Sequence, residues 1–399
     1  MPGTATFTEK PLRADLDAAL VKPQRRYDLD WLRVIAILLL LFFHCGMAFV
    51  AEWGWHIKNA ETSPIFQEWM FFLSRWRMAL LFLISGAGTW FVLKRATAGE
   101  YLTRRFLRLF VPLVFGMFVV VPPQIYMERL VQNAGFTSYW NFYPTVFQLK
   151  PYPDGNTSWH HLWFVAYLFI YSIIALPVFV ALRSTAGRAA VDRFCSRLSA
   201  PVFYCFGLPL AVVYAGLILR FPGPQNLIND WAWFSVYFTY FVYGFLFTLN
   251  ERFGVLMEEC RGMSLRLACA CYLVITYLRW NDAEPAPGYH LSYLLFLGLL
   301  ALNAWFWVVT ILGFGRRYLN KNNRLLAYAN EAIYPFYILH QTVIVVIAYY
   351  VVKTNDTVLT KFLFLSASSF LVTVGLYHFL IRPFRVTRFL FGMKAGGSE

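Results

Sequence analysis

Charged residues are scarce in this sequence. Asp, Glu, Lys and Arg make up only 14% of the 399 residues, whereas 59% are hydrophobic and 20% are aromatic. Because soluble domains usually carry about 25% charged residues, the composition excludes an ordinary soluble protein. Apolar runs of membrane-spanning length recur along the whole chain. We therefore expect an all-α, polytopic transmembrane helical bundle.

Ten stretches are apolar enough and long enough to predict membrane spans. They are residues 30–51, 74–94, 106–127, 161–182, 201–220, 231–249, 265–280, 290–313, 329–352 and 358–381. We expect residues 29–393 to form one transmembrane domain, between a disordered tail at 1–28 and a short tail at 394–399. The polar N-terminal tail lacks the apolar core of a signal peptide, so the first span is expected to remain as an anchor.

Acidic residues are fewer than basic ones, 21 against 35, and the net charge is +14. The placement of the basic residues decides what this excess means. Connections on one side of the ten spans hold 25 Lys and Arg, the other side holds nine, and Arg33 lies within the first span. The positive-inside rule then places both termini in the cytoplasm. We expect the lipid bilayer of the inner membrane as a partner, and no nucleic acid.

Cysteine is also infrequent. The six cysteines fall in spans or cytoplasmic connections and no pair has the spacing of a zinc finger, so we expect neither disulfides nor a metal site. The adjacent pair His160 and His161 lies at the outer mouth of the fourth span. Adjacent side chains on a helix point in different directions, which makes this a poor metal pair but leaves one imidazole free to face a cavity.

The first span carries two ionisable side chains, Arg33 and His44. Eleven helical residues correspond to roughly three turns and about 16 Å, so both lie on nearly the same face. Ionisable groups inside a span are costly and usually face a cavity with a function. The alternative is a structural histidine, hydrogen-bonded to another helix, with an arginine that snorkels to the surface.

The external loop after this span is dense in groups that stack on sugars or hydrogen-bond to them. An aromatic belt at the membrane surface is the alternative for its tryptophans. The candidate ligand-binding residues are Trp55, His56, Asn59 and Glu61. In the ninth span, Tyr337 and His340 are three residues apart and share one side of a helix. Pro335 is expected to kink that helix.

The second span opens with Arg77 near the outer boundary, at a depth comparable with His44. Its small residues Ser85, Gly86 and Gly88 permit either close helix packing or the passage of a narrow ligand. The third span begins with a basic cluster, Arg104, Arg105 and Arg108. This cluster either reflects the positive-inside rule alone or binds phosphate, since Arg104 and Arg108 are one helical turn apart.

In their order along the chain, these segments resemble the acyltransferase-3 family of integral membrane acyltransferases, and within it the osmoregulated periplasmic glucan succinyltransferases. The resemblance extends from Arg33 to about Met393. Its motifs are Arg33 and His44 separated by ten residues, Trp55-His-Ile-Lys-Asn-Ala-Glu61, Arg77-Met-Ala-Leu-Leu-Phe-Leu-Ile-Ser-Gly86, His161-Leu-Trp-Phe164 and Tyr337-Ile-Leu-His340. Ala87-Gly88 departs from the family, which commonly has a bulky aromatic residue there.

The resemblance implies transfer of an acyl group, of the succinyl or acetyl class, from cytoplasmic acyl-CoA to a hydroxyl of an extracytoplasmic glycan. Acyl-CoA is then a donor substrate, and no permanently bound cofactor is expected. A base in a water-poor cavity suits this reaction, which makes His44 the candidate general base. Arg77 is the candidate for oxyanion stabilisation, and His161 or His340 for orienting His44 or the acceptor. Arg33 joins the basic cluster as a phosphate ligand.

Two other functions fit parts of this pattern. A secondary transporter or glycan exporter also has many spans and buried ionisable residues, although no internal repeat or matching pair of broken spans is visible. An enzyme with a lipid acceptor would keep the same chemistry and place the acceptor in the outer leaflet. The external loops favour a glycan, because they are rich in groups that stack on sugars or hydrogen-bond to them.

Overall fold

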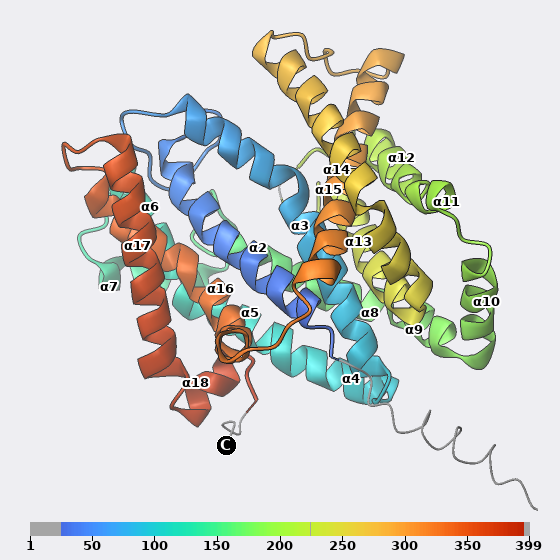
Figure 1. The fold of residues 1–399 in the computed structure, drawn as a ribbon. Helices are drawn as coiled ribbons and strands as arrows, with labels where there is room; N and C mark the ends of the chain where they lie inside the picture. The colour runs from blue at the N-terminus through green and yellow to red at the C-terminus, as the bar shows by residue number, and fades with distance from the viewer. Residues whose placement is uncertain (1–24, 224, 395–399) are drawn as a thin grey trace, which may run out of the picture.

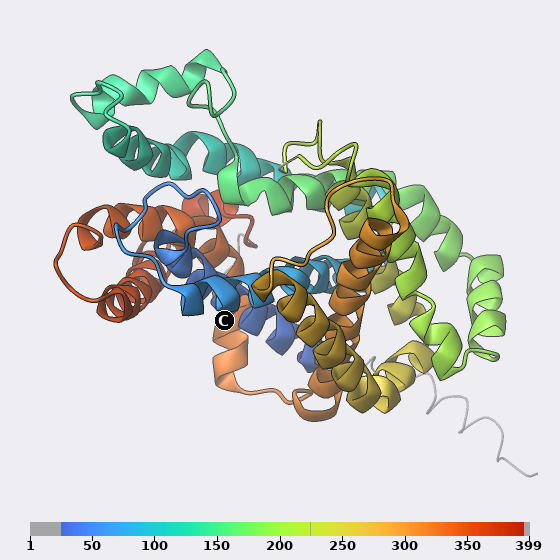
Figure 2. The same cartoon turned by 90° about the horizontal axis from the view of Figure 1, so that it is seen from above.

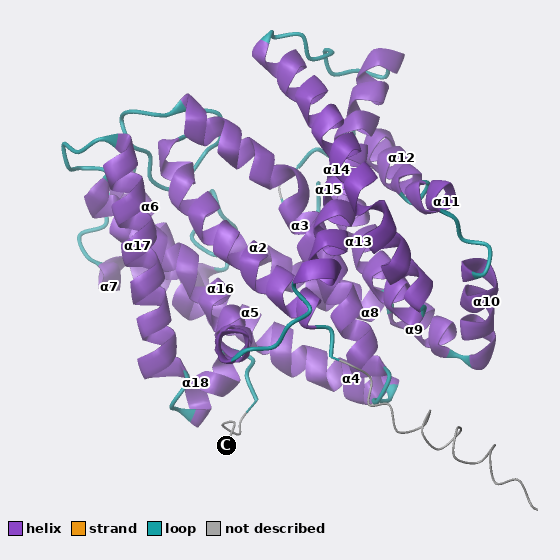
Figure 3. Cartoon of the chain, in the orientation of Figure 1, coloured by secondary structure: helices purple, strands orange, loops and turns teal. Residues whose placement is uncertain are grey.

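The computed structural model describes residues 25–223 and 225–394, and the regular elements within them are helices. Figures 1 and 3 show a bundle of long helices joined by loops. The all-α fold expected from the sequence is confirmed. The predicted terminal tails lie mostly outside the described residues, and the first helix already begins at Tyr27.

Eight segments in the described part of the chain are long and apolar enough to cross a membrane. They are α2 (Tyr27–Gly46) with the 3₁₀ turn Met47–Phe49; α3 (Pro64–Leu93); Ala98–Val131, which holds α4 (Ala98–Arg105), α5 (Val111–Phe115) and α6 (Pro122–Val131); Ala200–Leu217, which holds α11 (Ala200–Tyr204) and α12 (Gly207–Leu217); α13 (Trp231–Leu249); α15 (Leu291–Tyr318); α16 (Arg324–Val351); and Val358–Ile381, begun by α17 (Val358–Leu376). The shorter helices outside these spans include α7 (Tyr139–Phe142), α10 (Thr185–Cys195) and α18 (Arg385–Leu390).

Two of the ten expected spans are not among these eight segments. The expected span 161–182 is a bent pair, α8 (Trp163–Ile174) and α9 (Leu176–Arg183), with an angle of 52° between them. The expected span 265–280 is the second half of α14 (Glu251–Trp280). Only 12 uncharged residues separate Arg266 from Arg279 there, fewer than the roughly 20 that cross a bilayer. By length and composition the structure supports eight spans, or nine with the bent pair.

Capping residues explain where several helices begin. Ser63 caps α3 and Pro64 follows at its first position, where the missing N–H costs nothing. Thr97 and Glu100 form a capping box at the start of α4. Asn323 caps α16, which continues through Pro335 as one helix. The polar residues between the apolar runs therefore fix the ends of the spans.

Helix α2 lies at the centre of the bundle and packs against α3, α15, α16 and α17. Helices α3 and α13 approach one another closely, because a Cβ on Gly86 would lie 1.9 Å from the Phe241 carbonyl oxygen and one on Gly244 would lie 1.8 Å from that of Leu83. Viewed from above, α6 and α7 project from one end of the bundle (Figure 2). The central position of α2 brings Arg33 and His44 into contact with α16.

Candidate active site

Two histidines from separate helices meet in the interior of the bundle. His44, near the end of α2, lies with its Nδ1 atom 2.9 Å from Nε2 of His340, in the middle of α16. Their rings stack with centroids 5.0 Å apart and planes 9° apart. His340 is fully buried, whereas 9% of His44 remains exposed. Of the two histidines that the sequence analysis offered as orienting residues, His340 is the one that contacts His44, and His44 is the more exposed member of the pair.

The hydrogen bonds assign the tautomers of this pair. His340 Nδ1 lies 2.6 Å from the Tyr337 carbonyl oxygen, which can only accept, so this nitrogen carries the proton. In a neutral ring the His340 Nε2 is then an acceptor, and His44 Nδ1 must donate to it. This arrangement leaves a lone pair on His44 Nε2. A proton acceptor in this state and in this orientation has the properties of a general base.

His161, from a third segment of the chain, packs against His340 of the histidine pair. It lies in the turn His160–Leu162 before α8, and its Nε2–H donates to the Ile338 carbonyl oxygen at 2.9 Å. Its ring meets that of His340 edge-on, with centroids 5.3 Å apart. The Tyr337 hydroxyl donates to the His161 carbonyl oxygen. His161 and Tyr337 thus join α8 to α16 and hold His340 in place, and neither contacts His44 through a hydrogen bond.

Arg77 supplies a buried positive charge beside the histidines. It comes from α3, is 3% exposed, and its guanidinium lies 4.0 Å above the ring of Phe43, the residue before His44. Its Nε and Nη1 atoms are buried without a hydrogen-bond partner among the described residues. It lies within electrostatic range of both His44 and His340. A buried cation whose donors have no partner is suited to stabilise a negative charge that develops during a reaction.

The external loop contributes fewer ligand-binding candidates than the sequence predicts. Trp55 lies 5.2 Å from the His44 ring, and its indole N–H is buried without a partner among the described residues. Asn59 is buried and has a structural role, since it accepts from Lys361 Nζ at 2.9 Å and donates to the Glu61 carbonyl oxygen at 2.9 Å. The Glu61 side chain is exposed. Trp55 is therefore the loop residue that faces the histidine pair.

Lys58 fixes this loop onto the end of the first span. Its ammonium donates to the carbonyl oxygens of Met47 at 3.0 Å and Val50 at 2.5 Å. Burial lowers the pKa of the Lys58 ammonium, since desolvation disfavours the charged form. The loop is consequently held by its own polar side chains, and Trp55 has a defined position against His44.

His56 pairs with an acid that the sequence analysis did not select. Its Nδ1 atom contacts Oε2 of Glu128, which lies in α6 and is buried. The Tyr152 hydroxyl donates to Oε1 of Glu128 at 2.7 Å. Burial and the Glu128 carboxylate raise the pKa of Tyr152, so this hydroxyl remains a donor. The single signal in the sequence was an acidic residue at the outer end of the third span.

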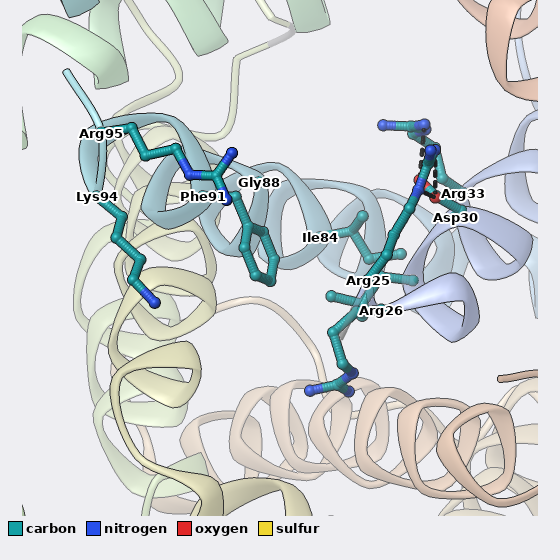
Figure 4. A pocket seen from close by; sticks show the side chains of 10 residues that line it. Arg25, Arg26, Asp30, Arg33, Ile84, Gly88, Phe91, Lys94 and Arg95 are labelled. Atoms are coloured by element: carbon teal, nitrogen blue, oxygen red, sulfur yellow. Dashed lines mark hydrogen bonds and ion pairs between the residues drawn. The ribbon is translucent and has the colours of Figure 1, made fainter. Parts of the chain in front are cut away.

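A basic cavity lies near the opposite end of α2. It has a volume of about 310 Å³ and lies between the start of α2 and the end of α3 (Figure 4). Figure 4 shows Lys94 and Arg95 on one side and Arg33 with Asp30 on the other. The residues that line it are Arg25, Arg26, Leu29, Asp30, Arg33, Ile84, Gly88, Phe91, Lys94 and Arg95. Five cations and one acid give this cavity a strongly positive field.

The predicted phosphate ligands are only partly at this cavity. Arg33 lines it, donating to Asp30 at 3.1 Å and Asn330 at 2.8 Å. Arg104 and Arg108 are exposed and Arg105 donates to Thr89 at 2.5 Å; none of the three lines the cavity. Lys94 and Arg95 line it instead, and in the sequence they are distinguished only as two of the 25 basic residues on one side of the spans.

The small residues of α3 divide between two roles. Gly86 packs against α13, as described above, and Ser85 donates to Leu81 of its own helix at 2.8 Å. Neither lines the cavity, so the structure supports helix packing as their role. A Cβ on Gly88, in contrast, would meet no atom within 4 Å, and Gly88 lines the cavity. Of the three small residues that the sequence analysis offered for packing or for ligand passage, Gly88 borders the cavity and Ser85 and Gly86 do not.

Comparison with known proteins identifies the family. Residues 26–378 match a family model described as an acyltransferase domain, the acyltransferase-3 family. The chain belongs to this family. It is similar to "Glucans biosynthesis protein C" of Escherichia coli strain K12 and of Shigella dysenteriae serotype 1, each 24% identical over 332 residues, covering 80% of this chain and 82% of the relative. No solved structure matches it.

Family membership establishes a multi-pass membrane acyltransferase and disfavours the transporter alternative. An acyltransferase needs a base for the acceptor and a place for the donor. The histidine pair and the basic cavity are separate sites that fit these two needs, and α2 contributes His44 to one and Arg33 to the other.

Proposed function

We propose that this protein transfers an acyl group from cytoplasmic acyl-CoA to a hydroxyl of an extracytoplasmic glucan, in the inner membrane. The observation that carries the proposal is the His44–His340 pair, because its tautomers leave a basic nitrogen on His44 inside the bundle. The names of the similar proteins support a glucan as the acceptor. The positive-inside pattern supports the cytoplasmic side for the donor.

The acceptor reacts at His44. Its Nε2 atom takes the proton of a sugar hydroxyl while the hydroxyl oxygen attacks the thioester carbonyl carbon of the donor. The carbonyl oxygen becomes negative in this step, and the unpaired donors of Arg77 stabilise it. Collapse of the intermediate breaks the carbon–sulfur bond, and the proton on His44 neutralises the departing CoA thiolate. The products are an acylated sugar and free CoA.

The donor binds in the basic cavity. The phosphates of CoA carry several negative charges, and the lining cations around Arg33, Lys94 and Arg95 complement them. Arg33 and His44 are about 16 Å apart along α2, which is comparable with the length of a pantetheine arm. The nucleotide therefore stays near the cytoplasm while the thioester reaches His44. Succinyl-CoA and acetyl-CoA are the two donors that we propose to test.

The experiment uses membrane vesicles of the two orientations, with labelled acyl-CoA outside and glucan on the opposite side. Inside-out vesicles expose the cytoplasmic face, so we expect label on the glucan only from these vesicles. Vesicles with matched amounts of His44→Ala provide the control for background transfer. Label transferred equally from right-side-out vesicles, or equally by the His44→Ala protein, would falsify the proposed direction or the proposed base, respectively.

A further inference from the structure

Three segments far apart in the sequence bring two imidazoles and a carboxylate together beside the histidine pair. His56 comes from the loop after the first span, Glu128 from α6, and His160 from the turn before α8. One metal-ligating atom of each residue lies within 4.8 Å of the other two. The rings of His56 and His160 have centroids 4.7 Å apart. This cluster is distinct from His44 and His340 and is unused by the proposed reaction.

Outer hydrogen bonds hold each member of the cluster by one atom. The Gln341 amide nitrogen donates to His56 Nε2 at 3.2 Å, and Ser158 Oγ lies 3.0 Å from His160 Nδ1. Glu128 Oε1 accepts from Tyr152 at 2.7 Å and from the side chain of the next helical turn, Gln132, at 3.0 Å. Metal ligands are held in this way by neighbours that orient their donor atoms.

The opposite atoms of the three side chains remain for a common ligand. They are His56 Nδ1, Glu128 Oε2 and His160 Nε2. The first two contact each other, whereas His160 Nε2 is buried and has no hydrogen-bond partner among the described residues. A buried polar atom of this kind costs free energy unless something binds it. Neither residue identity nor spacing in the sequence reveals this, because His56 and Glu128 are 72 residues apart.

We propose that His56, Glu128 and His160 bind a divalent zinc ion. Two imidazoles and one carboxylate form a donor set of the kind that binds zinc with a fourth position open, and imidazole favours zinc over magnesium or calcium. Ligand atoms at about 2.1 Å in a tetrahedron lie roughly 3.4 Å apart, so closing the site requires side-chain movements of about 1 Å. The ion replaces the proton that His56 Nδ1 donates to Glu128, and the Gln341 amide turns so that its oxygen accepts from the proton now on His56 Nε2.

Such an ion cross-links three segments, the external loop, α6 and the turn before α8. Trp55, the neighbour of His56, lies against His44 on one side and His56 on the other, with ring centroids 5.2 Å and 5.0 Å away. The ion therefore adds a second constraint, beside that of Lys58, on the position of the tryptophan that faces the histidine pair. Its open fourth position admits water or a hydroxyl of the acceptor.

The test measures metal binding by the purified full chain in detergent. The protein is stripped with a chelator, dialysed against Zn²⁺, and analysed for metal content and thermal stability. We expect one zinc per chain and a higher Tm with zinc. Loss of an outer-shell partner typically weakens metal binding 10- to 100-fold, and loss of a direct ligand should cost at least the upper value of this range. His160→Ala and Glu128→Gln each remove a direct ligand, so each is expected to weaken zinc binding at least about 100-fold.

Two further variants make the test discriminating. Tyr152→Phe removes only an outer hydrogen bond and is expected to weaken zinc binding roughly 10-fold. His290→Ala, an exposed histidine at the start of α15, is the matched control and should bind zinc as the wild type does. Glu128→Gln keeps an acceptor for Tyr152, which protects the fold if His160→Ala does not fold. Zinc content at the background level in the wild type, or unchanged in a folded Glu128→Gln protein, overturns the proposal.

Discussion

The two ends of α2 differ in how they are built. At its C-terminal end, His44 is buried within directional hydrogen bonds that connect α2, α16 and the start of α8. At its N-terminal end, Arg33 faces a basic cavity of about 310 Å³. There, Arg25 and Arg33 share the carboxylate of Asp30, and Lys94 has no ion-pair partner among the described residues. One region is a fixed hydrogen-bond network and the other is a charged space.

This difference matches two different chemical tasks. Proton transfer depends steeply on distance and tautomer, so the atoms that perform it need rigid neighbours. Binding a flexible polyphosphate needs positive charge near the phosphates more than it needs one geometry, and each cation contributes a small, salt-sensitive amount. Substitutions at the histidine end should therefore change the rate of the reaction, and substitutions at the cavity should change the affinity for the donor.

The largest effect is expected from His44→Gln. Glutamine can still donate to His340 Nε2, but it cannot accept a proton at neutral pH. General-base catalysis usually contributes at least about 10²-fold, so kcat for acyl transfer should fall by that factor or more. Affinity for acyl-CoA, measured by calorimetry, should be unchanged, because the cavity is about 16 Å away along the helix.

His378→Gln serves as the control for this prediction. His378 lies near the C-terminal end of the last span, with its Nδ1 atom 3.3 Å from the Tyr328 hydroxyl, and should tolerate the change with nearly normal kcat. A His44→Gln protein with near-normal transfer would show that the histidine pair is structural. The base would then have to be sought at His161, whose Nδ1 is buried without a partner among the described residues.

Sequence reasoning was most successful where a residue type is costly in its surroundings. The all-helical bundle follows from the long apolar runs, and His44, Arg77 and His340 stand out because ionisable groups inside spans need a partner or a function. The structure brings these three residues together. The rings of Tyr337 and His340 lie on one side of α16, with centroids 5.7 Å apart, as their spacing on one helix predicts.

The remaining features depend on contacts between segments that spacing does not encode. Gly86 and Gly88 look alike in the sequence, yet one faces the backbone of α13 and the other faces open space. The positive-inside rule concerns only the side of the membrane on which Lys94 lies and not the direction of its side chain, so its place at the cavity was not predictable. Glu128 has meaning only beside His56, and that pairing requires the fold of α6 against the external loop.

A smaller effect is expected from the double variant Lys94→Ala with Arg95→Ala. Exposed ion pairs are worth up to about 1 kcal/mol each, so losing two should raise the Kd for acyl-CoA roughly tenfold. The value of kcat at saturating donor should stay the same, and the Kd should depend less on salt than in the wild type. Calorimetry at two salt concentrations measures the Kd for acyl-CoA and its salt dependence.

The matched comparison is Arg104→Ala with Arg108→Ala, which removes two cations from the predicted cluster outside the cavity. We expect a smaller rise in Kd from this pair than from Lys94 and Arg95. If the two double variants weaken the donor equally, phosphate binding extends beyond the cavity to the start of the third span. If only the Arg104 and Arg108 variant has an effect, the cavity is not the donor site.

The smallest effect on folding, and the sharpest contrast within one helix, is expected at Gly88. Alanine there meets no atom within 4 Å and replaces glycine in a helix, so Gly88→Ala should raise helix stability by up to about 1 kcal/mol. Gly88→Leu should fold equally well but fill part of the cavity, and should raise the Kd for acyl-CoA a few-fold with kcat unchanged.

Gly86→Ala is the control: its Cβ would lie 1.9 Å from the Phe241 carbonyl oxygen, so this variant should lower the Tm. Thermal unfolding and donor calorimetry of the three proteins separate the two roles. A Gly88→Leu protein that binds acyl-CoA as tightly as the wild type would mean that the donor passes α3 elsewhere, and the cavity would lose its place in the reaction.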